Sequence, residues 1–242
     1  MTQIRTPQSR KNTDIRPLEL IPNFNRYAEG SILIKCGHTH VLCTASVQES
    51  VPRWIEEQNL EQGWITAEYS MLPRSTHTRS KRDREHVSGR TQEIQRLIAR
   101  ALRACVDLKK LGKRSIIIDC DVLQADGGTR TTSINGGCIA LGLAIGKLLQ
   151  TGTLKENPWI ESVSAISIGI RNGEILTDLD YNEDSRCDVD MNFVITQNEE
   201  FIEVQGTGEK KSFTPQELQQ MTDAALAASQ RLKKIQAEHF NF

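Results

Sequence analysis

The sequence contains no run of apolar residues that approaches the length of a membrane span. About 18 such residues are needed to cross a bilayer, and the first residues, 1 to 5, also lack the apolar core of a signal peptide. These two absences predict a cytoplasmic protein without a membrane partner.

The six cysteines form no C-x-x-C pair, so the sequence indicates neither a zinc cage nor a redox pair. Most of them stand in apolar segments, which predicts buried free thiols in a reducing compartment. His38 and His40 would share one face of a strand, but no third ligand is spaced to complete a metal site with them.

Neither of the common nucleotide-binding fingerprints, the P-loop and the G-x-G-x-x-G pattern, is present. Net charge also predicts no particular partner, because 30 Lys and Arg residues nearly cancel 31 Asp and Glu residues. The 242 residues can bury a sizeable core, and no repeat or linker divides them. We therefore predict a single domain, residues 1–242, of the α/β (α+β) class.

What is present is a strand, a glycine turn and a helix in the middle of the chain. Residues 115–118 are β-branched and apolar, Gly127 and Gly128 form the turn, and apolar residues then recur at helical spacing to Leu149. A helix that begins after such a turn directs unpaired N–H groups and the positive end of its dipole at the turn, and Arg130 adds a guanidinium suited to phosphate. On this stretch alone, a capped tight turn is as good an interpretation as an anion site.

Basic residues dominate residues 74–103, which contain nine Lys or Arg and three Asp or Glu residues. Residues 74–84 show no apolar periodicity, which predicts a mobile loop that contacts a polyanion; a solvated charged surface is the alternative. From Ser88 a helix is expected to run to near Gly112. Arg90 stands at its beginning, where a cation opposes the dipole by about 0.3–1 kcal/mol unless an anion accompanies it.

The other segments predict mostly strands. We expect an edge strand at 15–20, a hairpin at 31–47, a loop at 48–71, a strand at 162–170 that turns at Asn172 and Gly173, a last strand at 201–205, and a C-terminal helix from Thr214 to about 238.

Six acidic residues fall between Asp178 and Asp190, opposed only by Arg186. In a strand, Asp188, Asp190 and Asn192 would project from one face. Such a cluster suits Mg²⁺, which keeps several water ligands and also binds phosphate oxygens of a substrate; a solvated edge that discourages aggregation is the alternative. Arginines at helix starts, a glycine turn and a carboxylate cluster together suit phosphoryl transfer at a nucleic-acid end.

The sequence also resembles the ribonuclease PH family, phosphate-dependent 3′ exoribonucleases related to polynucleotide phosphorylase and the exosome ring subunits. The resemblance covers most of the chain, including Gly89-Arg90-Thr91 and Asp190-Met191-Asn192. The matching stretches are residues 42–46, 62–69, 71–79, 89–104, 119–130, 183–185, 190–192 and 202–207.

The resemblance implies a ribosomal protein S5 domain 2-like fold, with mixed β-sheets packed with helices, and a homohexameric ring built as a trimer of dimers. It implies that Arg90, Gly128, Thr129 and Arg130 bind phosphate. Asp184 and Asp190 match the catalytic or metal-site acids, which would hold Mg²⁺.

By the same resemblance, inorganic phosphate would attack the terminal phosphodiester and release nucleoside diphosphates, so that tRNA precursors are trimmed to the CCA end. Other RNA 3′ ends are expected as further partners. The reaction could also run in reverse. Arg74, Arg79 and Arg82 match the loop that family members use for tRNA and ring contacts. The sequence of residues 80–87 departs from the family pattern.

The same residues are also compatible with two other functions. A Mg²⁺-dependent hydrolytic nuclease would use the same acids to activate water. A non-catalytic RNA-binding ring subunit would need no catalytic machinery, and the presence of Arg90, Arg130, Asp184 and Asp190 together argues against it.

Overall fold

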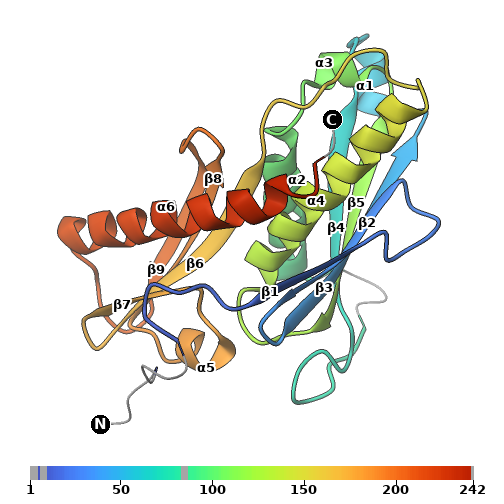
Figure 1. The fold of residues 1–242 in the computed structure, drawn as a ribbon. Helices are drawn as coiled ribbons and strands as arrows, with labels where there is room; N and C mark the ends of the chain where they lie inside the picture. Colours follow the sequence, from blue (N-terminus) through green and yellow to red (C-terminus); the bar gives the residue numbers. More distant parts are fainter. Residues whose placement is uncertain (1–4, 6–9, 83–86, 241–242) are drawn as a thin grey trace.

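The computed structural model describes residues 5, 10–82 and 87–240 (Figure 1). Its strands form two sheets, one of five strands in the order β1-β2-β3-β5-β4 and one of four in the order β7-β6-β8-β9. The strands are β1 (Leu18–Pro22), β2 (Gly30–Cys36), β3 (Thr39–Gln48), β4 (Trp64–Met71), β5 (Ser115–Gln124), β6 (Val163–Arg171), β7 (Glu174–Thr177), β8 (Val189–Thr196) and β9 (Phe201–Gly208). The helices are α1 (Arg53–Glu57), α2 (Gly89–Arg103), α3 (Leu108–Leu111), α4 (Thr129–Gln150), α5 (Tyr181–Asp184) and α6 (Pro215–Ala237).

Helix α4 lies between the two sheets (Figure 1), packed on β2 and β3 on one side and on β6 on the other. Helix α2 packs beside it on β4, and α6 covers the second sheet. Asn135 of α4 joins helix to sheet, because its side-chain amide donates to the carbonyl oxygen of Ala165 (2.9 Å) and accepts from the Ala165 N–H (2.8 Å). The expected mixture of sheets and helices is confirmed.

By length and composition, α4 could cross a membrane, although we expected no such segment. However, 78% of its apolar window is buried inside the molecule, as is typical of the core helix of a soluble protein. It is the helix that the central sequence pattern predicted, and it begins and ends within two residues of the expected bounds.

The predicted turn at Asn172 and Gly173 and the predicted start of the C-terminal helix at Thr214 are confirmed. Asn172 and Gly173 have φ angles of 51° and 79°, as a tight turn between β6 and β7 requires. At the start of α6, the Thr214 side chain accepts from the Glu217 N–H, and the Glu217 side chain accepts from the Thr214 N–H. The hairpin β2–β3 and the edge position of β1 are also as predicted. The six cysteines are buried and free.

The loop predicted over residues 48–71 is wrong, because this segment contains α1 and the strand β4. In β4, Ile65, Ala67 and Tyr69 are buried, whereas the residues between them are more exposed. This alternation is weak in sequence because Ala67 is small and because an apolar residue, Trp64, also stands on the less buried face. Strand β4 is completed by its parallel pairing with β5, which is distant in the chain.

Two predicted boundaries also need correction. Strand β5 does not end at Ile118, since Cys120 and Val122 continue its buried face up to the glycine turn. Helix α2 ends at Arg103 rather than near Gly112, because Val106 pairs with Trp159 and the Asp107 side chain caps a separate helix, α3. That residues 1–242 form a single domain stays a prediction.

Candidate active site

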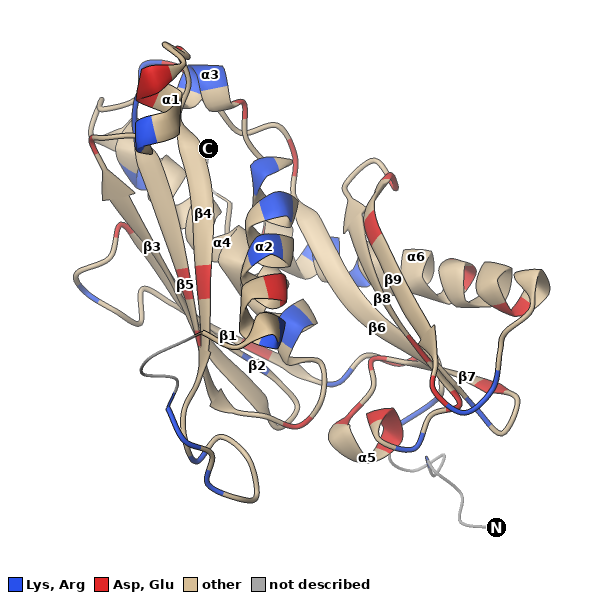
Figure 2. Cartoon of the chain, turned by 180° about the vertical axis from the view of Figure 1, so that it is seen from behind, with Lys and Arg blue, Asp and Glu red and all other residues tan. Residues whose placement is uncertain are grey.

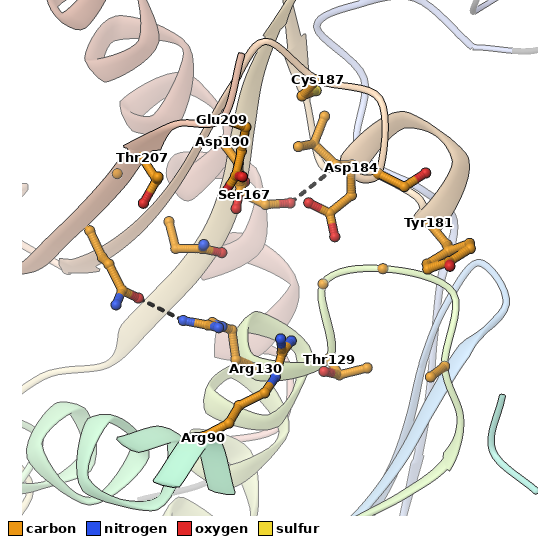
Figure 3. Close-up of a pocket in the computed structure, with 18 of the residues that line it drawn as sticks. Arg90, Thr129, Arg130, Ser167, Tyr181, Asp184, Cys187, Asp190, Thr207 and Glu209 are labelled. Carbon is orange, nitrogen blue, oxygen red and sulfur yellow. Dashed lines mark hydrogen bonds between the residues drawn. The ribbon is translucent and has the colours of Figure 1, made fainter. Parts of the chain in front are cut away.

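A cavity of about 620 Å³ opens where the beginnings of α2 and α4 face α5, β8 and β9. All six residues predicted to bind phosphate or metal line this cavity (Figure 3). They are Arg90, Gly128, Thr129, Arg130, Asp184 and Asp190. Residues that are distant in sequence therefore form one site.

The two arginines occupy equivalent positions on two different helices. Arg90 is the second residue of α2, whose N-cap Ser88 accepts a hydrogen bond from the Thr91 N–H (3.2 Å). Arg130 is the second residue of α4, after Gly128 at the N-cap. Because helix N-termini carry partial positive charge, each arginine adds a cation where the backbone already favours an anion.

The glycine turn requires both of its glycines. Gly127 and Gly128 have φ angles of 76° and 63°, a region that residues with a Cβ rarely adopt. A Cβ on Gly127 would lie 2.6 Å from the Leu179 carbonyl oxygen, so the turn contacts the segment before α5 directly. Thr129 follows the turn, and its hydroxyl lies 2.9 Å from the Tyr69 hydroxyl of β4.

Carboxylates form the opposite wall of the cavity. Asp184 is the last residue of α5 and Asp190 lies on β8, and in Figure 3 both face Arg90 and Arg130. Burial, together with the charge of Asp184, raises the pKa of Asp190 to about 6. Burial also raises the pKa of Asp184, against the opposing charges of Arg90 and Arg130.

This donor set fits a hard cation. Two partly buried carboxylates, one of which raises the pKa of the other, are stabilised as anions by a shared positive ion. No described residue donates a hydrogen bond to the Asp184 carboxylate, whose oxygens can therefore serve as ligands. Within the described part of the chain, no group of three His, Cys, Asp or Glu residues could hold a metal by itself. A cation here would therefore need water or substrate oxygens as further ligands, as Mg²⁺ typically has.

Two residues that the sequence did not predict for the site, Glu93 and Gln205, orient Arg130. Arg130 Nη1 donates to Gln205 Oε1 of β9 (2.6 Å) and lies 3.4 Å from Glu93 Oε1 of α2. Gln205 Nε2 in turn donates to Glu93 Oε1 (2.8 Å). This triangle fixes the guanidinium at the junction of α2, α4 and β9. No local pattern marks Glu93 or Gln205 for this role.

The predicted RNA-binding arginines lie outside the cavity. Arg74, Arg79 and Arg82 are exposed on the loop after β4, and Arg74 Nη1 donates to the His77 carbonyl oxygen (2.8 Å). The loop reaches the site through Thr76, which lines the cavity. Residues 83 and 84, the end of the loop predicted to contact a polyanion, lie outside the described residues. Figure 2 shows further Lys and Arg residues along α2, which leads into the same site.

Asp188 also lies apart from the site. It does not line the cavity; its Oδ2 accepts from the Asn172 N–H (3.0 Å) at the β6–β7 turn. Asp190 and Asn192, the next two residues on that face of β8, do line the cavity. The predicted trio therefore contributes two residues to the site.

Comparison with known protein families gives two matches that together cover most of the chain. The model of domain 1 of the 3′ exoribonuclease (ribonuclease PH) family matches residues 14–145, and that of domain 2 matches residues 161–228. The chain belongs to the ribonuclease PH family. The resemblance seen in the sequence and the expected S5 domain 2-like fold are thereby confirmed.

Solved structures share the family fold. Rice (Oryza sativa) Rrp46 is 19% identical, with a TM-score of 0.78, and the match covers 98% of this chain and 100% of Rrp46. A chain of the Archaeoglobus fulgidus exosome with RNA bound to the active site is 21% identical, with a TM-score of 0.78 and coverage of 96% and 92%. A chain of an archaeal exosome core is 20% identical, with a TM-score of 0.74 and coverage of 95% and 90%.

In this ribonuclease PH family chain, the six clustered acids have different roles. Asp178 is buried and pairs with Arg16, with Nη2 2.8 Å from Oδ1. Glu183 is buried and pairs with Arg5 (2.6 Å) and Arg10 (2.7 Å). These pairs span more than 160 residues of sequence, so no local signal could separate them from the site acids.

The buried pairs predict a loss of stability in acid. Burial alone would raise the pKa of Asp178, but its hydrogen bonds with Arg16 outweigh burial and hold the pKa below its usual range; Arg5 does the same for Glu183. A depressed folded-state pKa stabilises the fold above the unfolded-state pKa, about 4, and this stability is lost as pH falls through the folded-state pKa. We expect the urea midpoint to fall steeply below about pH 4.

Two Asp→Asn variants test this prediction, one at the buried pair and one at an exposed control position. Asp178→Asn should unfold more easily at pH 7, by roughly 3–5 kcal/mol, since it leaves Arg16 buried without its partner, and should show a shallower acid slope. Asp223→Asn, on the exposed face of α6, should match wild type at every pH. If the urea midpoint falls equally with pH in wild type and in both variants, the pair of Asp178 and Arg16 is not a cause of the acid sensitivity.

Proposed function

We propose that this chain is a phosphorolytic 3′→5′ exoribonuclease that trims nucleotides beyond the CCA end of tRNA precursors. The main support is that Arg90 and Arg130, each at the N-terminus of a helix, face two aspartates across one cavity. These aspartates are Asp184 and Asp190. Cations and carboxylates on opposite walls suit the transfer of a phosphoryl group between oxygens.

In the proposed reaction, inorganic phosphate binds to Arg90, Arg130 and the backbone N–H groups of the glycine turn. One phosphate oxygen attacks the phosphorus of the last phosphodiester. The bond from this phosphorus to the preceding 3′ oxygen breaks, the terminal nucleotide leaves as a nucleoside diphosphate, and the 3′ oxygen takes up a proton. In reverse, the same steps add a nucleotide from a diphosphate.

The arginines and the carboxylates have separate tasks in this reaction. Arg90 and Arg130 neutralise the equatorial oxygens of the reacting phosphorus and bring the attacking phosphate into line. Asp184 and Asp190 are the proposed ligands of Mg²⁺, which would supply positive charge for the leaving oxygen. Arg130, held by Gln205 and Glu93, needs little reorganisation.

The proposed partners follow from family membership and the loop after β4. The exosome structures that share the fold support RNA as substrate and a ring as the assembled form. We propose a homohexamer, a trimer of dimers, that acts in the cytoplasm, with Arg74, Arg79 and Arg82 in contact with the body of the tRNA.

The test is a digest of a short 3′-extended tRNA at increasing phosphate, with identification of the products. Nucleoside diphosphates that appear only when phosphate is supplied support the proposal. Monophosphates formed without phosphate would indicate a hydrolytic nuclease. RNA binding without cleavage, at any phosphate and Mg²⁺ concentration, would indicate a non-catalytic ring subunit.

We expect Arg79→Ala to flatten the salt dependence of tRNA binding. Each phosphate contact contributes about −0.7 to −0.9 to the slope of log K against log salt concentration. Loss of one contact should therefore make the slope less negative by about 0.7 to 0.9. The measurement is tRNA affinity at several salt concentrations. The control is Arg53→Ala in α1, exposed at the opposite end of the first sheet (Figure 1). If Arg79→Ala and Arg53→Ala show the same salt dependence of tRNA binding, Arg79 does not contact a phosphate.

A further inference from the structure

Arg16 lies behind the glycine turn and does not line the cavity. It precedes β1, and only 6% of it is exposed. Its Nη1 donates to the carbonyl oxygen of Asp126 (2.6 Å) and reaches that of Gly127 (3.4 Å). The guanidinium therefore binds the turn through the two peptide groups that lead into Gly128.

These contacts fix the direction of the turn's N–H groups. In a planar trans peptide, the C=O and the N–H point in opposite directions. With the carbonyls of Asp126 and Gly127 held toward Arg16, the N–H groups of Gly127 and Gly128 point away from it. Among the described residues, no acceptor is found for either N–H group. Both glycines line the cavity, so these donors are available to an anion there.

The other side of the guanidinium is held by Asp178. Arg16 Nε donates to Asp178 Oδ2 (2.9 Å), Nη2 donates to Oδ1 (2.8 Å), and the Arg16 backbone N–H donates to Oδ2 (2.7 Å). Asp178 has a φ of 57°, an uncommon conformation that these bonds stabilise. Leu179 and Asp180 follow, and lead directly into α5 and Asp184.

Arg16 thus ties the phosphate wall of the cavity to the carboxylate wall from behind. Thr39 supports the same turn, since its hydroxyl donates to the Gly127 carbonyl oxygen (2.6 Å) and accepts from the Asp126 N–H (3.0 Å). The fit is close, because a Cβ on Gly128 would lie 2.9 Å from Arg16 Nη2.

We propose that Arg16 is a positioning residue for the phosphate co-substrate: by holding the carbonyls of the glycine turn, it directs the turn's N–H groups at inorganic phosphate. This inference rests on the proposed phosphorolytic function. Arg16 itself does not touch the phosphate. Its effect is geometric, so a lysine, with the same charge but without the planar fork, cannot replace it.

The experiment measures phosphate and RNA separately on the intact oligomer. Binding of inorganic phosphate is followed by calorimetry, and KM for phosphate and KM for a 3′-extended tRNA are determined by product formation. For Arg16→Lys we expect phosphate affinity at least about tenfold weaker and an unchanged KM for RNA. Arg114→Lys is the matched control, because Arg114 also joins a carbonyl (Leu111) to a carboxylate (Glu49), and it does not line the cavity.

A second variant tests the inference if Arg16→Lys does not fold. Arg16→Gln with Asp178→Asn removes both buried charges together, so that neither is left unpaired, and should fold with the same phosphate defect. Folded Arg16→Lys with wild-type phosphate affinity would overturn the inference, as would equal losses for phosphate and RNA. If wild type itself binds no phosphate or releases monophosphates, the proposed function fails instead, and the inference fails with it.

Discussion

Replacing Arg130 with alanine is expected to lower the rate of phosphorolysis about a hundredfold, the usual effect of removing one electrostatic stabiliser from a transition state. Arg130 begins α4 beside the glycine turn, and its guanidinium faces Asp184 and Asp190. In the proposed reaction, this position places Arg130 where negative charge gathers on the reacting phosphorus. Binding of RNA, which depends on many contacts along the chain, should change far less.

The measurement is kcat and KM for phosphate, with RNA affinity determined independently. Arg130→Lys keeps the charge but loses the paired geometry that holds Gln205, so we expect an intermediate rate. Arg96→Ala, an exposed arginine of α2 that does not line the cavity, is the control for general loss of positive charge. Equal losses of rate and RNA affinity in Arg130→Ala would show that Arg130 only binds RNA.

Asp190→Asn is expected to have an effect at least as large, on the order of 10²–10³ in kcat. Asp190 is partly buried beside Asp184, and its raised pKa reflects that burial and the second carboxylate. The substitution keeps the shape of the side chain but removes one of the two negative charges proposed to hold Mg²⁺. Chelation of divalent cations should inhibit wild type to a similar level.

The chain offers a close control in Asp188→Asn. Asp188 lies two residues away and outside the cavity, where it accepts a hydrogen bond from the Asn172 backbone. Rates should be measured over a range of Mg²⁺ concentrations, and Mg²⁺ binding should be followed separately by thermal shift. Asp188→Asn should keep the wild-type rate and Mg²⁺ response. If both variants behave alike, or if chelation leaves wild type fully active, the assignment of Asp190 is wrong.

Much of the candidate site could be predicted because its charged residues occur within short, recognisable sequence patterns. Arg90 follows an N-cap serine, Arg130 follows two glycines, and Asp190 alternates with core residues of a strand. Each signal spans only a few residues. The prediction that these segments meet came from their combined chemistry and from the family resemblance, and the cavity brings all of them together.

The errors concern features that depend on partners distant in the chain. Residues 64–71 resemble a loop in sequence, because the pairing that makes them strand β4 joins them to β5, roughly 50 residues further along the chain. Helix α2 was predicted to be too long because Val106 leaves the helix to pair with Trp159. In both cases the backbone hydrogen bonds that decide the structure are formed by remote segments, which local periodicity does not reveal.

The amino-acid sequence alone was enough to predict the strand-turn-helix order, the hairpin turns, the start of the C-terminal helix and four charged residues of the site, Arg90, Arg130, Asp184 and Asp190. These depend on backbone preferences and side-chain spacing over a few residues. Which acids pair with arginines and which face the cavity becomes clear only from the three-dimensional fold. Asp178 and Asp184 are six residues apart, yet one is paired with Arg16 and the other lies open to the site. Burial and long-range pairing separate them, and neither is encoded in the local pattern.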